Sequence, residues 1–262
     1  MSSPSRQDKV IGFVPARMAA SRFPGKPLHP ILGRPMIEHV FRRAERFKGW
    51  HGLYLATCDK PIADLGVAHG WPVIMTSDKH TRCLDRIAEA ARKCGQKLGP
   101  TDIVVCVQGD EPMLHPDMIA AAIKPLQKDR QVQGTILAME IAERGQFENP
   151  DTVKIIYNKR DEVLYTSRAP IPYCKGKFSL AHGARRIYGI FAFRWQALQS
   201  FTNMTEGRLE RLESCDSNRL LDGDIRQRIA PYPFRKSFSV DSPADIAQVE
   251  AHMKSDPLWG TY

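Results

Sequence analysis

The chain has 262 residues, 42% of them hydrophobic, and its 38 Lys and Arg residues outnumber its 29 Asp and Glu residues, which gives a net charge of +9. The length suits one large α/β domain, and the apolar share excludes wholesale disorder. No apolar run approaches the roughly 20 residues of a membrane-spanning helix, and the first residues lack the apolar segment of a signal peptide. We therefore expect a cytoplasmic protein with a disordered tail at residues 1–8 and a single domain over residues 9–262.

The positive charge favours acidic partners, which include nucleotides, sugar acids and nucleic acid. The chain carries no nucleic-acid-binding signature, so a nucleic-acid-binding protein would rest on net charge alone, and we expect no nucleic-acid partner. The six cysteines form no C-x-x-C pair, and none lies near a histidine at zinc-finger spacing. Free thiols are therefore expected.

The first predicted element is a buried strand over residues 10–14, which ends in a cationic loop. This loop carries Arg17, Arg22 and Lys26, spaced by small residues and turned by Pro24-Gly25. In open α/β sheets, ligands bind beyond the carboxyl ends of the strands. Three positive charges at such a place suit a polyphosphate, and the alternative is a solvated basic turn.

Strand and helix patterns alternate through the first half of the chain. Strands are predicted at 53–57, 73–75 and 102–107, and helices at 35–47, 61–68 and in the residues that lead to 93. This order predicts a Rossmann-like, mostly parallel sheet flanked by helices. Beyond it, the patterns predict helices at 115–126 and 206–221, strands at 133–141 and 225–229, and a final helix with Asp245 in its first turn.

The strand at 102–107 is apolar on both faces, as a central parallel strand must be, and runs into Gln108-Gly109-Asp110-Glu111-Pro112. A carboxylate at the end of a central strand points into the ligand crevice. Mg²⁺ prefers one or two carboxylates, with water and substrate phosphates completing its shell. Asp110 is therefore the candidate metal ligand, or alternatively a helix cap, and Glu111 is the better candidate for a structural role.

Several motifs closely resemble those of the cytidylyltransferases that activate the sugar acid Kdo, the CMP-Kdo synthetases. The first is P-A-R, S-R-x-P-G-K-P and G-R-P-M-I over residues 15–37, and the second is Q-G-D-E-P at 108–112. The later ones are N-P-x-x-V-K at 149–154, L-Y-x-S-R at 164–168 and V-D-x-P at 240–243. The resemblance covers about residues 9–253 and is patchier after residue 158.

The resemblance implies a nucleotidyltransferase fold and transfer of CMP from CTP to an anionic acceptor, a Kdo-like sugar acid or a phosphonate, with release of pyrophosphate. It implies that Asp110 and Asp241 hold Mg²⁺. Arg17 and Lys26, helped by Arg22, would offset charge on the outer phosphates. The residues with a catalytic role would be Arg17, Lys26 and Asp110.

Further contacts follow from the same resemblance. The nucleotide is expected to meet Pro15, Ala16, Arg17, Arg22, Lys26, Asp85, Arg86, Gln108 and Gly109. The acceptor is expected to meet Arg168, Arg186, Tyr188 and Asp216. These acceptor contacts belong to a lobe over about residues 150–235, which in the family also makes the homodimer contact. Lys154 would face the phosphates or the acceptor, or else lie on the surface.

The chain departs from the family pattern on both sides of the expected site. Arg82-Cys83-Leu84 replace the family's S-G-T, so base recognition should differ, with Arg82 as a phosphate or acceptor contact or a solvent-facing residue. In the family's R-H-x-G-x-Y-x-Y motif, Ile187 replaces the histidine and Phe191 a tyrosine, and residues 216–219 read D-S-N-R instead of E-Q-L-R. Fewer polar partners predict an acceptor other than Kdo, the alternative being drift in a less constrained lobe.

Two other functions are compatible with the sequence. One is a nucleotide-binding regulatory protein that has lost catalysis, and the other is a nucleotidyltransferase that uses another NTP. The presence of both Asp110 and Asp241 favours an enzyme, since a protein without catalysis does not need metal ligands. No Ser/His/Asp signature of covalent catalysis is visible.

Overall fold

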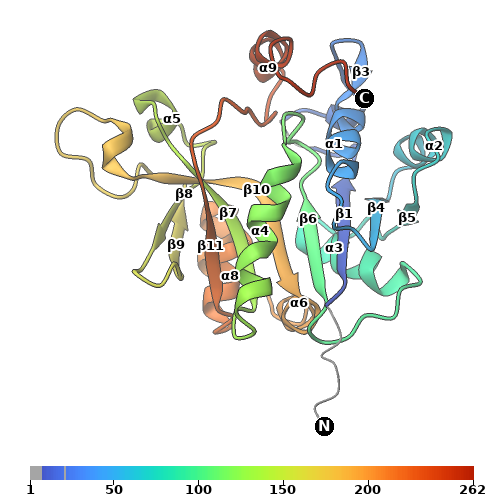
Figure 1. Ribbon diagram of the computed structural model, residues 1–262, viewed down its shortest axis with the longest axis horizontal. Helices are drawn as coiled ribbons and strands as arrows, with labels where there is room; N and C mark the ends of the chain where they lie inside the picture. The colour runs from blue at the N-terminus through green and yellow to red at the C-terminus, as the bar shows by residue number, and fades with distance from the viewer. Residues whose placement is uncertain (1–7, 21) are drawn as a thin grey trace.

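The computed structural model describes residues 8–20 and 22–262. This part of the chain builds one nine-stranded sheet with helices on both faces (Figure 1). Its strands are β1 (Val10–Ala16), β4 (Gly52–Thr57), β5 (Val73–Met75), β6 (Ile103–Val107), β7 (Gly134–Glu140), β8 (Lys154–Tyr157), β9 (Val163–Ser167), β10 (Arg185–Arg194) and β11 (Gln227–Tyr232). A separate two-stranded hairpin consists of β2 (Pro30–Ile31) and β3 (Arg34–Pro35).

The helices follow the strands along the chain. The α-helices are α1 (Met36–Glu45), α2 (Lys60–Ala68), α3 (Cys83–Lys93), α4 (Pro116–Lys128), α5 (Arg144–Glu148), α6 (Trp195–Thr202), α7 (Arg208–Glu213), α8 (Ser217–Asp222) and α9 (Asp245–Met253). Two 3₁₀ turns, η1 (Lys26–Leu28) and η2 (Leu180–His182), lie in loops. Within the described residues, none of these helices has the length and apolar character that a membrane crossing requires.

The sheet runs in the order β11-β7-β10-β6-β1-β4-β5, and the β8–β9 hairpin extends from β10. The pairs β1–β4, β1–β6, β4–β5 and β7–β11 are parallel. β10 is antiparallel to both of its main neighbours, β6 and β7. The expected mostly parallel α/β fold is therefore confirmed, with β10 inserted antiparallel near its centre and the β8–β9 hairpin also paired antiparallel.

The core consists of two apolar layers, one on each face of the sheet. On one face, Val40 of α1 and Met118 of α4 pack over Val14 and Val105. On the other face, Ile87 of α3 and Leu198 of α6 pack against Phe13 and other side chains of β1 and β6. Alternate residues of β1 and β6 therefore enter opposite layers, as required of strands buried on both faces.

Most predicted elements are present, and two differ. The strand expected at 73–75 is β5, and the final helix begins at Asp245 as expected. The single helix expected over 206–221 is wrong, because Ser214 adopts a left-handed conformation (φ 50°) that separates α7 from α8. Pro35 caps α1 instead of lying in its first turn. Nearly all of the predicted tail, residues 1–7, lies outside the described residues.

Candidate active site

The ends of β1 and β6 approach each other closely and form the floor of the site. A Cβ atom on Gly109, just beyond β6, would lie 2.6 Å from the carbonyl oxygen of Pro15 in β1. Only glycine allows the backbone of the Gln108-Gly109-Asp110 turn to pass this near β1. The turn is therefore held directly beside the cationic loop (residues 17–26).

The antiparallel direction of β10 brings its first residues to the same edge of the sheet. Ile190 pairs with Val107, the last residue of β6. The backbone N–H of Gln108 donates to the carbonyl oxygen of Gly189 at 2.8 Å. Residues 186–189 of β10 thus lie next to the carboxyl end of β6, which a parallel strand in this position would not achieve.

Two adjoining cavities open at this edge of the sheet. The first, of about 660 Å³, contains the cationic loop and is called the nucleotide cavity here. The second, of about 680 Å³, extends between β10, the turn before β8 and the segment after β11, and is called the acceptor cavity. The two cavities share several polar side chains, among them Asp110, Asp151, Arg168, Asp216 and Asp241. These residues mark the junction of the cavities.

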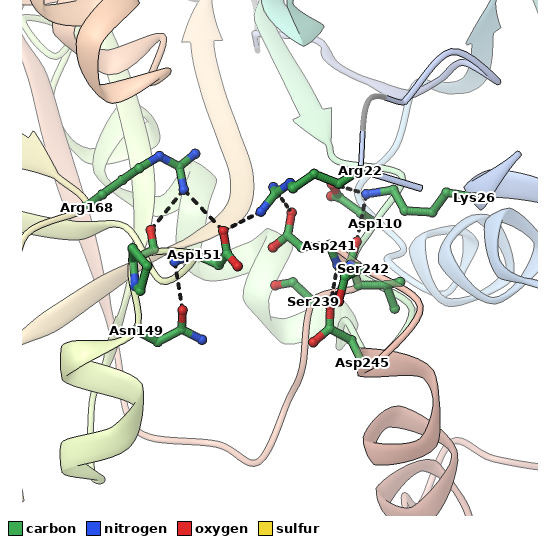
Figure 2. A network of polar contacts seen from close by, with 12 residues as sticks. Arg22, Lys26, Asp110, Asn149, Asp151, Arg168, Ser239, Asp241, Ser242 and Asp245 are labelled. Carbon is green, nitrogen blue, oxygen red and sulfur yellow. Dashed lines mark hydrogen bonds and ion pairs between the residues drawn. The ribbon is translucent and has the colours of Figure 1, made fainter. Parts of the chain in front are cut away.

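The cationic loop supplies three positive charges to the nucleotide cavity. Arg17, Arg22 and Lys26, the residues expected to bind phosphate, all line it. Lys26 Nζ donates to Asp110 Oδ2 at 3.1 Å and to the carbonyl oxygen of Val240 at 2.7 Å. Arg22 Nη2 donates to Asp241 Oδ1 at 2.7 Å (Figure 2). The loop is thus already paired with the carboxylates at the junction.

Asp110 and Asp241 come from distant parts of the chain and meet at the junction. The backbone N–H of Val240 donates to the carbonyl oxygen of Asp110 at 2.9 Å, which joins the two loops. Burial raises the pKa of Asp241, and the neighbouring charge of Asp110 raises it further. Asp110 Oδ1 is buried and has no hydrogen-bond partner among the described residues. Two acceptor-rich carboxylates therefore lie close enough to repel each other.

Glu111 has the structural role that the sequence suggested. Its side chain is buried, and its Oε1 accepts hydrogen bonds from Gly189 N at 3.0 Å and Ser239 Oγ at 2.8 Å. Burial raises its pKa to about 7. Glu111 thereby joins β10 to the segment that carries Asp241.

The far end of the nucleotide cavity is formed by residues 80–86. Arg86 is buried and donates to Thr76 Oγ1 at 2.6 Å and to the carbonyl oxygen of His80 at 3.0 Å, so it shapes this loop from within. Asp85 is not among the residues that line either cavity, because it points towards Arg219 Nη1, 3.4 Å away. Arg82 faces the cavity but is paired with Glu206 at 2.6 Å.

Most of the predicted nucleotide contacts are thus gathered in one place. Those that line the nucleotide cavity are Pro15, Ala16, Arg17, Arg22, Lys26, Arg86, Gln108 and Gly109.

On the acceptor side, both expected arginines, Arg168 and Arg186, line the cavity. Arg168 Nε donates to the carbonyl oxygen of Glu213 at 2.9 Å, which fixes its direction. Arg186 is buried, donates to the carbonyl oxygen of Ser237 at 2.8 Å, and has a buried Nε without a partner among the described residues. Tyr188 is placed differently from the prediction, since it is fully buried and its hydroxyl contacts Ser237 Oγ at 2.6 Å. It supports the cavity from behind and is not among the residues lining it.

The structure places Asp151 and Lys154 in ways that the sequence did not predict. Asp151 occupies a variable position of the N-P-x-x-V-K motif, yet it lines both cavities. Lys154 faces neither the phosphates nor solvent: it is fully buried, and its Nζ donates to the carbonyl oxygen of Asn149 at 2.8 Å. Burial, together with the charge of Arg168, lowers the pKa of Lys154 to about 8. The motif alone carries no signal for either placement.

Comparison with known proteins matches this geometry to a family. A family model for cytidylyltransferases matches residues 11–237. A 3-deoxy-manno-octulosonate cytidylyltransferase from Nitratidesulfovibrio vulgaris is 40% identical over 237 residues, which are 90% of this chain and 92% of the relative. Another, from Syntrophobacter fumaroxidans, is 37% identical over 250 residues, which are 95% and 99% of the two chains. The chain belongs to the 3-deoxy-manno-octulosonate cytidylyltransferase family.

Solved structures extend the likeness of this cytidylyltransferase to its fold. A CMP:2-keto-3-deoxy-manno-octonic acid synthetase solved with CTP has a TM-score of 0.83 and 33% identity, and the match covers 95% of this chain and 99% of the other. A 4-diphosphocytidyl-2C-methyl-D-erythritol synthase from Anaerococcus prevotii, 16% identical with a TM-score of 0.63, shares the fold. The predicted family, nucleotidyltransferase fold and CTP-dependent cytidylyl transfer are confirmed.

Several of the positions at which this cytidylyltransferase departs from the family motifs face the cavities. Ile187 and Phe191 both line the acceptor cavity, where the family pattern has a histidine and a tyrosine. Cys83 lines the nucleotide cavity, and Gln108 Nε2 lies 3.4 Å from its Sγ atom. Ile187, Phe191 and Cys83 therefore lie on the walls of the two cavities.

Proposed function

We propose that this cytidylyltransferase transfers CMP from CTP to a Kdo-like sugar acid, with Mg²⁺ held by Asp110 and Asp241 at the junction of the two cavities. The observation that carries the proposal is the junction itself. A cationic pocket for a triphosphate and an arginine-lined pocket for an acid share one wall, and two carboxylates that repel each other lie in it. A reacting hydroxyl and an α-phosphate would meet there.

The residues at the junction fit a magnesium ion. The unpartnered Oδ1 of Asp110 and the partly exposed carboxylate of Asp241 are hard oxygen donors, which Mg²⁺ prefers. The described residues contain no cluster of three His, Cys, Asp or Glu side chains that could hold a metal. Two carboxylates with phosphate oxygens and water make a common set of Mg²⁺ ligands. When bound, the ion would polarise the α-phosphate and offset its charge.

The protein's own side chains would do the remaining work. A hydroxyl oxygen of the acceptor attacks the α-phosphorus and gives its proton to water. The bond to the bridging oxygen of the β-phosphate breaks, so negative charge grows on the departing pyrophosphate. Arg17, Arg22 and Lys26 would stabilise that charge from the cationic loop. Arg168 and Arg186 would hold the acid group of the acceptor and orient its hydroxyl. No covalent intermediate with the protein is needed.

The acceptor cavity supports an acid that differs from Kdo in its contacts. Ile187 and Phe191 offer an apolar surface where the family pattern offers hydrogen-bond partners. A buried hydroxyl facing this surface would lose its hydrogen bonds to water without replacement. The arginines still require an anion. A Kdo-like acid with fewer or differently placed hydroxyls therefore fits the cavity best.

We also propose that the protein is a homodimer that pairs through its acceptor lobe. Seven large apolar side chains are exposed in the described part of the chain, and five of them lie between residues 150 and 235. Tyr173 is 85% exposed and Leu164 on β9 is 53% exposed. This stretch of the chain therefore holds most of the exposed apolar side chains that an interface between protein copies could cover. Sedimentation of the purified protein, with Tyr173→Lys as the comparison, would measure the assembly.

The decisive experiment measures pyrophosphate release by purified protein over an array of nucleotides and acids. The acids include Kdo, other 2-keto sugar acids and small phosphonates. We expect release with CTP, Mg²⁺ and one class of sugar acid, and little release with UTP, GTP or ATP. Activity with another NTP would contradict the nucleotide assignment. CTP binding without turnover on any acid would favour a regulatory protein instead.

A further inference from the structure

Asp151 is a carboxylate that none of the roles above accounts for. It lies where the two cavities join and lines both. Its Oδ1 is ion-paired with Arg22 Nη1 and lies 3.7 Å from Arg168 Nη1. One carboxylate oxygen therefore stands between an arginine of the cationic loop and an arginine of the acceptor cavity (Figure 2).

The turn that carries Asp151 is firmly held. Asn149 accepts two hydrogen bonds at 2.8 Å, one at Oδ1 from the backbone N–H of Asp151 and one at its carbonyl oxygen from the buried Lys154. Pro150 restricts the backbone between them. The carbonyl oxygen of Pro150 accepts a hydrogen bond from Arg168 Nη1 at 2.9 Å. Asp151 and Arg168 are therefore held as one unit.

Arg22 uses different N–H groups for its two carboxylate partners. Nη2 donates to Asp241 Oδ1 at 2.7 Å, while Nη1 is paired with Asp151. A guanidinium presents its donors as a rigid fork, so one branch can change partner while the other stays in place. A triphosphate oxygen can replace Asp241 on Arg22 while Asp151 still holds the side chain.

The Arg22–Asp151 ion pair contributes little to the stability of the fold. The two side chains are 48% and 46% exposed, and ion pairs at such exposure contribute little to folding. The location of the pair, where both substrates must meet, indicates a role in the reaction instead. A variant that breaks the pair should therefore fold normally.

We propose that Asp151 is a positioning residue for the transfer reaction. It holds Arg22 at a set place relative to Arg168, so that the arginine for the triphosphate and the arginine for the acceptor acid act at a fixed separation. Such alignment matters, because a misplacement of about 1 Å can cost roughly a hundredfold in rate. The identity of the two substrates rests on the proposed function, whereas the contacts among the three side chains do not.

The test begins with Asp151→Asn, which removes the charge and keeps the size. We expect kcat to fall about tenfold to a hundredfold, with the melting temperature unchanged. CTP affinity, measured by calorimetry, should be equal to or higher than that of the wild type, because the variant has one negative charge fewer to repel the triphosphate. Asp151→Glu restores the carboxylate and should recover part of kcat. The control is Glu148→Gln, an exposed residue paired with Arg144 that is not among those lining either cavity, and it should match the wild type.

A double-variant cycle with Arg22→Gln separates the possible outcomes. The double variant should be no slower than Arg22→Gln alone, and additive losses in kcat would overturn the proposal. The proposal would also be overturned if Asp151→Asn lowered CTP affinity, kcat and the melting temperature together, since that would indicate a structural role only.

A calorimetric cycle needs no acceptor. The effect of Asp151→Asn on CTP affinity should differ more than about twofold between proteins with and without Arg22→Gln. If the wild-type protein transferred no CMP, the proposed function would be wrong. The calorimetric coupling would still test the contact between Asp151 and Arg22.

Discussion

Cys83 Sγ donates a hydrogen bond to Asp216 Oδ2 at 3.6 Å, although the two residues are 133 positions apart in the chain. Arg82 Nε also approaches Asp216, with 3.8 Å to Oδ1. Arg219 Nη1 in turn lies 3.4 Å from Asp85 Oδ1. The two segments that depart from the family motifs, 82–84 and 216–219, are therefore in contact. The changes at residues 82–84, where base recognition is expected, and at residues 216–219 on the acceptor side are therefore parts of one network.

A first prediction concerns the protonation of Asp216. Burial raises its pKa from 3.8 to about 6, against the opposing charge of Arg82. A raised carboxyl pKa means that the folded chain holds this proton more tightly than the unfolded chain. The resulting stabilisation is present below about pH 4 and is lost as the pH rises to about 6 and beyond. At pH 7, Asp216→Asn should raise the free energy of unfolding, by about 3 kcal/mol at most.

Urea unfolding of both proteins at several pH values measures this effect. Other titrating groups cancel in the difference between wild type and variant, which should shrink as the pH falls from 7 towards 4. A difference that does not vary with pH would show that Asp216 ionises in the folded protein as it does in the unfolded chain. A loss of activity in the stabilised variant would indicate that the ionised carboxylate is retained for function.

The second prediction concerns the carboxylates at the junction. Asp110→Asn or Asp241→Asn should each lower turnover by orders of magnitude, because each removes one of the two proposed Mg²⁺ ligands. The fold should persist, since the hydrogen bond that joins the two loops uses the backbone of Asp110 and Val240. Turnover and Mn²⁺ binding in the presence of CTP should fall together. Near-normal turnover in either variant would end the two-carboxylate model.

The third prediction concerns the cationic loop. Arg17→Ala and Lys26→Ala should weaken CTP binding more than CMP binding, because their proposed partners are the outer phosphates. Calorimetry with both nucleotides gives the two affinities directly. Equal losses for CTP and CMP would place these side chains near the α-phosphate or the nucleoside instead.

Much of the fold follows from the sequence because buried strands carry uninterrupted apolar runs. The apolar run at 103–107 predicts β6 for this reason, and the short apolar run at 73–75 predicts β5, although Met75 is 48% exposed there. The order of strands in the sheet does not follow, because the antiparallel placement of β10 between β6 and β7 depends on contacts between distant segments. The break at Ser214 was missed for a similar reason, since serine carries no strong signal for a left-handed residue.

The site shows the same division. Arg17, Lys26 and Asp110 could be proposed because they lie in motifs that follow predicted strands, and Asp241 because its V-D-x-P motif resembles that of the family. Asp151 could not, because its motif leaves that position open and its role arises from how the 149–151 turn faces the cationic loop. The burial of Lys154 could not be predicted from its motif either, since a buried lysine is rare. Its Nζ is stabilised here by the carbonyl oxygen of Asn149.

The last prediction concerns the acceptor. Kdo should be a poor substrate, because Ile187 and Phe191 line the acceptor cavity where the family pattern has polar side chains. Each hydroxyl that is buried without a partner costs roughly 1–3 kcal/mol. Two or three such losses amount to about a thousandfold in specificity. The retained arginines, Arg168 and Arg186, still demand an acid.

The double variant Ile187→His, Phe191→Tyr tests this prediction in the opposite direction. It returns two hydrogen-bonding side chains to the cavity wall and should raise kcat/KM for Kdo while lowering it for the native acceptor. Phe193→Tyr is the matched control, because Phe193 lies on the same strand but is fully buried and does not line the cavity. It should not improve the use of Kdo. Efficient conversion of Kdo by the wild-type protein would mean that the apolar side chains do not meet the acceptor's hydroxyls, and that the arginines alone select it.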